Sequence, residues 1–201
     1  NNLILCNKEK LMNPNAFQLG VPGSGKSFLT KEQIIFIALS TDDDIIICDP
    51  EGEYSLLVKE LGGEVIQIAA GSPNHINAMD MNEGYGDSGN PVGDKSQFVM
   101  SLFEQLDRDG VKPSERSIID RCVTLVYQDY YQTKQVPTLI TLREQLLEQP
   151  EIEARSLALK LELFKDGSLD AFAHETNVNT SSRIVYYDNF KLGKQLKTMG
   201  L

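Results

Sequence analysis

An eight-residue glycine-rich segment has the residue types and spacing most suggestive of chemistry in this sequence. Residues 20–27 read Gly-Val-Pro-Gly-Ser-Gly-Lys-Ser and match the pattern GxxxxGK[ST] in full. Glycines allow backbone angles that other residues avoid, so successive N–H groups can converge on one anion. A helix beginning near Lys26 would direct the positive end of its dipole to the same point. The segment is therefore predicted to bind the phosphates of a nucleoside triphosphate through Gly20, Val21, Pro22, Gly23, Ser24, Gly25, Lys26, Ser27 and Phe28.

Two side chains of this segment have specific expected roles. Lys26 is expected to reach the β- and γ-phosphates as a catalytic residue, and the Ser27 hydroxyl is expected to ligate magnesium. ATP and Mg²⁺ are thus the predicted cofactors. The alternative to nucleotide binding is a glycine-rich turn that matches the pattern by chance. The context argues against it, because residues 16–19 have the pattern of a strand and residues 26–40 that of an apolar helix.

A second acidic motif follows the β-branched run Ile-Ile-Ile-Cys at 45–48, which is typical of a buried parallel strand. Asp49 ends this strand, where α/β sheets bind ligands, and can hold the magnesium through a water molecule. Glu51 and Glu53 can orient or deprotonate the water that attacks the γ-phosphate. A plain strand-to-helix turn explains the same residues: Asp49 caps the helix, Pro50 starts it, and the two glutamates favour its N-terminal dipole. Both interpretations stay open.

The first half of the chain alternates between strand and helix patterns. This order implies crossover connections and a parallel sheet. A polar, glycine-rich stretch at 72–94 then reads as a loop. The expected elements before that loop are strands at 3–6, 16–19, 45–48 and 64–68 and helices at 26–40 and 53–61, the second helix ending at Gly62-Gly63.

The second half of the chain is helical until a final strand. Apolar stripes, such as the stripe of Phe98, Leu102, Phe103 and Leu106, are expected to form core. The fold class is thus α/β, with a parallel sheet interrupted by an all-α insertion of about 80 residues. Residues 1–94 and 176–201 are assigned to the core domain and 95–175 to the insertion. The expected elements are helices at 95–107, 114–131, 138–147 and 151–164, a strand at 183–187 and the start of a helix at 193–199.

The composition excludes several other classes of function. A net charge of −10 repels nucleic acid and anionic membranes, so direct nucleic-acid binding is not expected. The longest apolar runs fall far short of the roughly 20 residues that span a bilayer. Three scattered cysteines indicate a reducing compartment, and two histidines are too few for a zinc site. Because the chain starts at Asn1 rather than methionine, it is expected to be part of a longer protein.

Taken together, these residues resemble the HerA/FtsK-like P-loop ATPases, and specifically the conjugative-transfer ATPases of type IV secretion systems (the VirB/TraC/TrsE class). Nearly the whole chain takes part in this resemblance. The combination of the glycine-rich loop with Asp-Pro-Glu-Gly-Glu-Tyr one strand later is its most specific part. The matching segments are residues 11–15 (LMNPN), 20–27 (GVPGSGKS), 45–54 (IIICDPEGEY), 62–66 (GGEVI), 76–77 (IN), 166–169 (DGSL) and 176–178 (TNV).

The resemblance implies a RecA-like core with an all-α insertion, ATP hydrolysis and ring-like homo-oligomers, expected to be hexamers. It also implies work with other secretion-system subunits on substrate transfer or pilus assembly, in the cytoplasm or peripherally at the inner face of the cell membrane. One departure concerns the Asp-Glu pair that usually ends a later strand of this family. Here the strand-final Asp188 is followed by Asn189. If the family is right, the hydrolytic glutamate lies beyond Leu201, the domain is truncated, and this chain hydrolyses ATP weakly.

Two other functions fit the same motifs. One is a small P-loop kinase, whose lid would supply arginines to the transferred phosphate. The other is a non-enzymatic assembly module that responds to bound nucleotide. Arg183 is a further candidate, as a γ-phosphate finger acting across a subunit interface. The arginines available to a kinase lid, which show no clustering in the sequence, are Arg108, Arg116, Arg121, Arg143 and Arg155.

Overall fold

A computed structural model describes residues 10–69, 71–81, 85–86, 89–107, 109–165, 167 and 169–191. It divides into two compact units, Asn1–Asp43 and Asp44–Leu201, each of which is described by itself. The strand predicted at 3–6 and the helix predicted to start at 193 lie outside the described residues. The predicted division into a core domain and an insertion at 95–175 stays a prediction.

The first unit contains one long helix, α1 (Lys26–Ser40), at the position predicted. Ile34 is its buried residue, whereas Phe28 and Phe36 keep 67% and 68% of their surface exposed. The strand predicted at 16–19 is wrong, because residues 16–19 form neither a strand nor a helix. A strand is stabilised by hydrogen bonds to a neighbouring strand, and an apolar pattern alone cannot supply them.

The second unit contains a three-stranded sheet of β1 (Ile45–Asp49), β2 (Glu64–Gln67) and β3 (Ile184–Asp188). The order is β1-β3-β2 and both pairings are parallel, which confirms the predicted parallel sheet. β3 comes last in the sequence and lies in the centre, and its register places Asp188 beside Asp49. The expectation that β1 is buried holds only in part. Ile46, which is 70% exposed, and Cys48 lie on the exposed face of β1, whereas Ile45 and Asp49 lie on its buried face.

The connection from β1 to β2 contains α2 (Ser55–Glu60), within the predicted 53–61. It ends at Gly62, which has a φ of 75° and donates its N–H to Lys59 O. Gly63 follows at a close approach, since a Cβ there would lie 2.8 Å from side-chain atoms of Val58 and Ile184. The glycine pair therefore ends the helix and lets β2 approach β3 closely.

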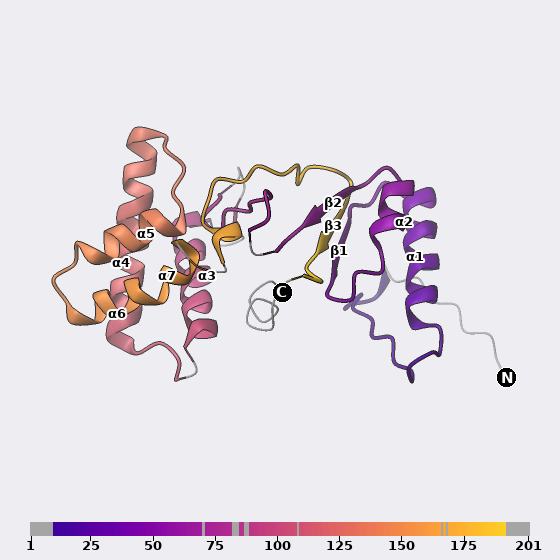
Figure 1. The fold of residues 1–201 in the computed structure, drawn as a ribbon, viewed down its shortest axis with the longest axis horizontal. Coiled ribbons are helices and arrows are strands. Elements are labelled where there is room, and N and C mark those ends of the chain that lie inside the picture. Colours follow the sequence, from indigo (N-terminus) through magenta and orange to yellow (C-terminus); the bar gives the residue numbers. More distant parts are fainter. Residues whose placement is uncertain are drawn as a thin grey trace. The chain divides into compact units, whose positions relative to one another are not determined.

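Between β2 and β3 the chain forms the helical group, which we define as α3–α7 (Figure 1). Its first helix starts four residues earlier than predicted. The Asn90 side chain accepts a hydrogen bond from Gly93 N (3.1 Å), and Pro91 occupies the first helical position, which favours a helix start. The segment predicted as one helix at 151–164 is two. The helices are α3 (Pro91–Leu106), α4 (Pro113–Thr133), α5 (Leu139–Leu147), α6 (Ile152–Lys160) and α7 (Glu162–Lys165), and the 3-10 turn η2 (Asp170–Phe172) follows.

The helical group contributes most of a hydrophobic core that also includes Ile66 and Val185 of the sheet. Most of the predicted core stripe on α3 is confirmed, but Phe98 is 43% exposed. The fully buried residues of that helix are Val99 and Phe103. Helical periodicity predicts that α3 has an apolar face, and packing against α4 determines which side of that face is buried.

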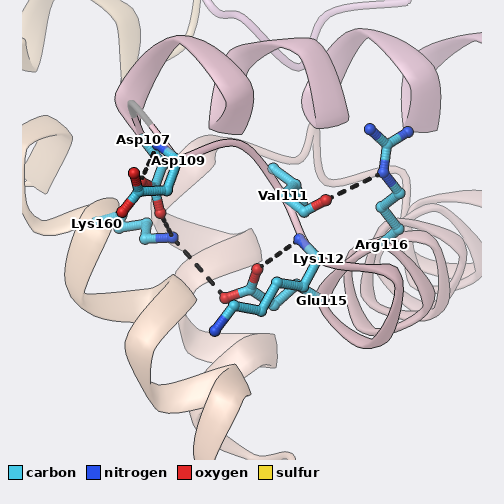
Figure 2. Close-up of polar contacts among 7 residues, drawn as sticks. All are labelled: Asp107, Asp109, Val111, Lys112, Glu115, Arg116 and Lys160. Atoms are coloured by element: carbon cyan, nitrogen blue, oxygen red, sulfur yellow. Dashed lines mark hydrogen bonds and ion pairs between the residues drawn. The ribbon is translucent and has the colours of Figure 1, made fainter.

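A polar network ties the turn after α3 to α6 (Figure 2). Lys160 Nζ lies 2.7 Å from Asp107 Oδ2 and 3.9 Å from Glu115 Oε1. Glu115 is buried, and its other oxygen accepts a hydrogen bond from Lys112 N at 2.8 Å. The hydrogen bond from Lys160 and a second one from the Asp109 N–H lower the pKa of Asp107. The network therefore ties the α3–α4 turn to α6 through a partly exposed ion pair and a buried carboxylate.

Candidate functional site

The glycine-rich segment forms a tight turn that leads directly into α1. Gly23 and Gly25 have φ angles of 79° and 87°, a region that strongly favours glycine. Ser24 N donates to Val21 O at 3.1 Å and closes the turn. Leu29 N donates to Gly25 O, which makes this the first intrahelical bond. The N–H groups of Lys26, Ser27 and Phe28 therefore stand at the helix start, where a helix offers them no carbonyl partner.

Lys26 lies across this turn. Its Nζ donates to the carbonyls of Gly20 (2.8 Å) and Val21 (3.2 Å). An ammonium has three donors, so these bonds hold the side chain over the loop and leave one donor for an anion. Gly20 is also closely packed, because a Cβ at this position would overlap Ser24 Oγ. Loop and lysine thus present backbone N–H groups and a positive charge in one small region.

Two residues that the motif does not predict support the loop. Gln18 Nε2 donates to Lys26 O (2.9 Å), and Thr30 Oγ1 donates to Gln18 Oε1 (2.9 Å). The chain entering the loop is thereby tied to the first turn of α1. No sequence pattern pointed to Gln18, since its role follows from a contact with a residue 12 positions away.

Asp49 organises the turn after β1 in the second unit. The residue is 8% exposed, and its carboxylate accepts hydrogen bonds from Glu51 N (2.9 Å) and Glu53 N (2.7 Å). Gly52, with a φ of 77°, lets both N–H groups turn toward the same carboxylate. The alternative in which Asp49 caps a helix begun by Pro50 is wrong, because α2 begins only at Ser55. Asp49 therefore closes a separate loop of its own.

The two glutamates of this turn are exposed, so their carboxylates are open to solvent. The sequence did not single out Tyr186, whose hydroxyl lies 3.5 Å from Asp49 Oδ2. Burial raises the pKa of Tyr186, and the neighbouring carboxylates of Asp188 and Asp49 raise it further. Tyr186 thus keeps its proton at neutral pH and serves as a hydrogen-bond donor. Only the register between β1 and β3 brings it to Asp49.

Arg183 lies just before the N-terminal end of β3, whereas Asp49 lies at the C-terminal end of the parallel strand β1. Arg183 directly precedes Ile184, which pairs with Ile45, and its carbonyl accepts a hydrogen bond from Ile45 N at 2.8 Å. Asp49 pairs with Asp188, five residues beyond Arg183, so at about 3.3 Å per residue the two positions lie roughly 16 Å apart along the strands. The structure therefore does not bring Arg183 and Asp49 together within one chain.

No group of three or more His, Cys, Asp or Glu residues in the described ranges is arranged to hold a metal ion. A magnesium ion bound with a nucleotide needs fewer protein ligands, since phosphates and waters complete its shell. Ser27, half-buried at the second residue of α1, fits such a role. Each carboxylate oxygen of Asp49 already accepts one backbone hydrogen bond and retains further lone pairs, which fits a water-mediated contact.

Comparisons with known proteins support the architecture. No protein-family model matches the sequence, and no curated protein sequence matches it. Among solved structures, the chain is similar to VirB4 of Thermoanaerobacter pseudethanolicus, with a TM-score of 0.73 and 24% identity. The match covers 93% of this chain and 54% of that protein, so the chain spans about half the length of its structural relative. The predicted α/β fold, with helices inserted before a returning strand, is thus the fold of part of VirB4.

Proposed function

We propose that this chain is the nucleotide-binding part of a P-loop ATPase that powers a type IV secretion system. The observation that carries the proposal is the turn formed by residues 20–27, with two left-handed glycines, a lysine held over the loop and a helix starting at Lys26. Its similarity in fold to VirB4 supports secretion rather than another use of the same loop.

Each predicted site residue has a place in this proposal. The N–H groups of residues 23–28 and the Lys26 ammonium bind the triphosphate of ATP. Ser27 would ligate magnesium and Asp49 would hold one of its waters, and the bound ion would supply positive charge that neutralises the phosphates. Glu51 and Glu53 orient the attacking water. Because both are exposed in a turn fixed by Asp49, either carboxylate can swing toward a ligand without breaking a buried contact.

The wider role follows from the resemblance to conjugative ATPases of the HerA/FtsK-like group. The full-length protein would form a hexamer with other secretion-system subunits and drive substrate transfer or pilus assembly at the inner face of the membrane. None of the helices in the described ranges is both long and apolar enough to cross a bilayer. Residues outside 1–201 would supply the missing Asp-Glu pair, so this chain alone would bind ATP better than it hydrolyses it.

A small P-loop kinase finds less support. A kinase lid turns several arginines toward the transferred phosphate, whereas arginines of the helical group are engaged elsewhere. Arg116 pairs with Glu104 (2.5 Å), Arg121 with Glu151 (2.7 Å) and Arg143 with Glu162 (3.4 Å). Each of these pairs joins a different set of elements, so the three charges do not converge.

The test compares ATP binding in the wild-type chain and in Lys26→Ala. We expect the variant to lose at least about a hundredfold in affinity, because a desolvated ion pair with phosphate is lost, and to keep its unfolding temperature. Lys59→Ala, at an exposed lysine of α2, serves as the control and should bind as the wild type does. Equal affinity in wild type and Lys26→Ala would refute the proposal.

Phosphate release by a protein extended past Leu201 tests the catalytic part. Glu51→Gln and Glu53→Gln keep size and remove charge, so the one that orients the water should lower turnover without weakening ATP binding. Transfer of phosphate to a nucleoside in place of release to water would favour the kinase. Binding without any turnover, equal in wild type and both glutamine variants, would favour an assembly module that only responds to nucleotide.

A further inference from the structure

The Gln18 side chain connects the two ends of the glycine-rich loop. Its Nε2 donates to Lys26 O at 2.9 Å, and its Oε1 accepts from Thr30 Oγ1, also at 2.9 Å. The two contacts also determine which way the carboxamide faces, because turning it over would place Oε1 against another oxygen, Lys26 O. Gln18 therefore holds the segment that enters the loop against the first two turns of α1, which begins at Lys26.

The Lys26 carbonyl belongs to the same peptide unit as the Ser27 N–H. A trans peptide is planar, so its C=O and its N–H point in opposite directions and turn together. In a helix the carbonyls point toward the C-terminal end, so the Ser27 N–H points toward the N-terminal end of α1, where the helix offers it no carbonyl. A contact that holds Lys26 O in place therefore also fixes the direction in which the Ser27 N–H is offered to an anion.

The same contact makes the Ser27 N–H a better donor. Hydrogen bonds in a chain polarise one another and strengthen each bond by about 10–30%. Here the chain runs from Thr30 Oγ1 through the Gln18 amide to Lys26 O. Thr30 Oγ1 also lies 3.1 Å from Lys26 O, but a hydroxyl has a single proton to donate. Thr30 can thus act on the peptide of Ser27 through Gln18 or directly, and the two routes predict different behaviour of variants.

We propose that Gln18 is a positioning residue for phosphate binding and that Thr30 acts through it, an inference that rests on the function proposed above. Gln18 holds the Lys26–Ser27 peptide so that the Ser27 N–H already points at the place of a phosphate oxygen before ATP arrives. Binding then costs less, because this donor need not be turned and ordered by the ligand. In this role Gln18 needs no contact with the phosphate, and all the groups involved belong to the first unit.

The experiment measures the dissociation constant of ATP and the unfolding temperature of the whole chain in wild type, Gln18→Met and Gln33→Met. Methionine keeps the length of glutamine and removes both hydrogen bonds. We expect Gln18→Met to raise the dissociation constant about fivefold, the equivalent of one lost hydrogen bond, and to unfold at the temperature of wild type because Gln18 is exposed. Gln33, which is also exposed and lines the same hollow beside α1, provides the matched control and should tolerate methionine without loss of affinity.

Variants of Thr30 separate the route through Gln18 from the direct one. Thr30→Ser keeps the hydroxyl and should bind ATP as wild type does, whereas Thr30→Val keeps the shape without the hydroxyl and should weaken binding about threefold. In the Gln18→Met background, Thr30→Val should have no further effect. The amide proton of Ser27, followed by NMR in the ligand-free chain, should shift to lower frequency in Gln18→Met, because its peptide loses a hydrogen bond at the carbonyl.

Three results would overturn the inference while leaving the proposed function intact. The first is an unchanged affinity or an unmoved Ser27 amide proton in Gln18→Met, when Lys26→Ala has lost its affinity for ATP. The second is an equal effect of Thr30→Val with and without Gln18, which would assign the hydroxyl to the direct route. The third is a lower unfolding temperature of both Gln18→Met and Gln18→Ala, or their failure to fold, which would make Gln18 a purely structural residue. Failure of the function itself gives a different result, namely that wild type and Lys26→Ala bind ATP equally.

Discussion

The phosphate loop of the first unit and the helical group of the second unit are each stabilised by a different kind of contact. The hydrogen bonds around the loop join residues at most 12 positions apart, and α1 buries only Ile34. The helical group is fixed by distant contacts: Asn77 reaches Pro137, and the Tyr127 hydroxyl donates to Met79 O. Side chains such as Phe103 and Leu142 are completely buried there. Local contacts shape the loop and leave its donors exposed, whereas long-range packing forms the buried core of the helical group.

The largest expected effect separates the two regions by stability. Phe103→Ala removes a fully buried ring from α3 and should lower the free energy of unfolding by about 3–5 kcal/mol. Phe36→Ala removes a ring of the same size from α1 that is 68% exposed, and should change it by less than about 0.5 kcal/mol. Urea unfolding followed by circular dichroism measures both. Similar losses in the two variants would show that the regions do not differ in packing.

The second-largest expected effect is on ATP affinity. The comparison is between two glycines that both have a positive φ. Gly25 in the loop (φ 87°) and Gly62 after α2 (φ 75°) both have room for a Cβ, so alanine at either position costs only backbone strain of about 1–2 kcal/mol. Gly25→Ala should weaken ATP binding about tenfold, because the strain moves the phosphate-binding N–H groups. Gly62→Ala should lower stability and leave ATP binding unchanged. Titration with a fluorescent ATP analogue checks the prediction, which fails if both variants bind alike.

The smallest effect is a pH dependence inside the helical group. Lys160 and the Asp109 N–H lower the pKa of Asp107, so this carboxylate stabilises the fold above its ordinary pKa of about 3.9 and loses that contribution as the pH falls through its lowered folded-state value. In Lys160→Met (Figure 2) the loss of stability on acidification below about pH 4 should therefore be smaller than in wild type. Acid unfolding curves of the wild type and Lys160→Met measure this loss of stability.

Arg116→Met provides the control for that prediction. Arg116 is 51% exposed and pairs with Glu104, itself 38% exposed, so solvent screens this ion pair. The acid unfolding curve of Arg116→Met should match that of the wild type. A curve of Lys160→Met that coincides with both would mean that Lys160 does not set the pKa of Asp107.

Sequence patterns predicted the elements well where local rules operate. The boundaries of α1 follow from the glycines before it and the apolar run within it, and the end of α2 follows from Gly62. The segment at 16–19 shows the limit, because its apolar pattern predicts a strand and the segment forms none. The start of α3 was missed for another reason: Pro91 and Gly93 read as loop residues until the Asn90 cap is seen.

The spacing of residues in the sequence identifies the phosphate-loop candidates. Other candidate site residues can be assessed only when the register of the sheet is known. Arg183, just before the last strand, was a candidate for contacting the γ-phosphate. Parallel pairing places it at the opposite end of the strands from Asp49. Tyr186 carries no recognisable motif. Its relevance follows from the pairing of β3 with β1, which places the Tyr186 hydroxyl 3.5 Å from Asp49 Oδ2.

The sequence by itself determined the phosphate loop, the type of most elements and the parallel α/β class. These depend on backbone preferences of glycine and on apolar periodicity, which act over a few residues. Only the tertiary structure determined that the last strand lies in the centre of the sheet and that Asp49 closes its own turn. It also determined that the buried side chain of Asn77 has hydrogen-bond partners and that of Asn189 has none among the described residues. Those features depend on which distant segments meet, and each hydrogen bond or packed surface there exists only once both partners are in place.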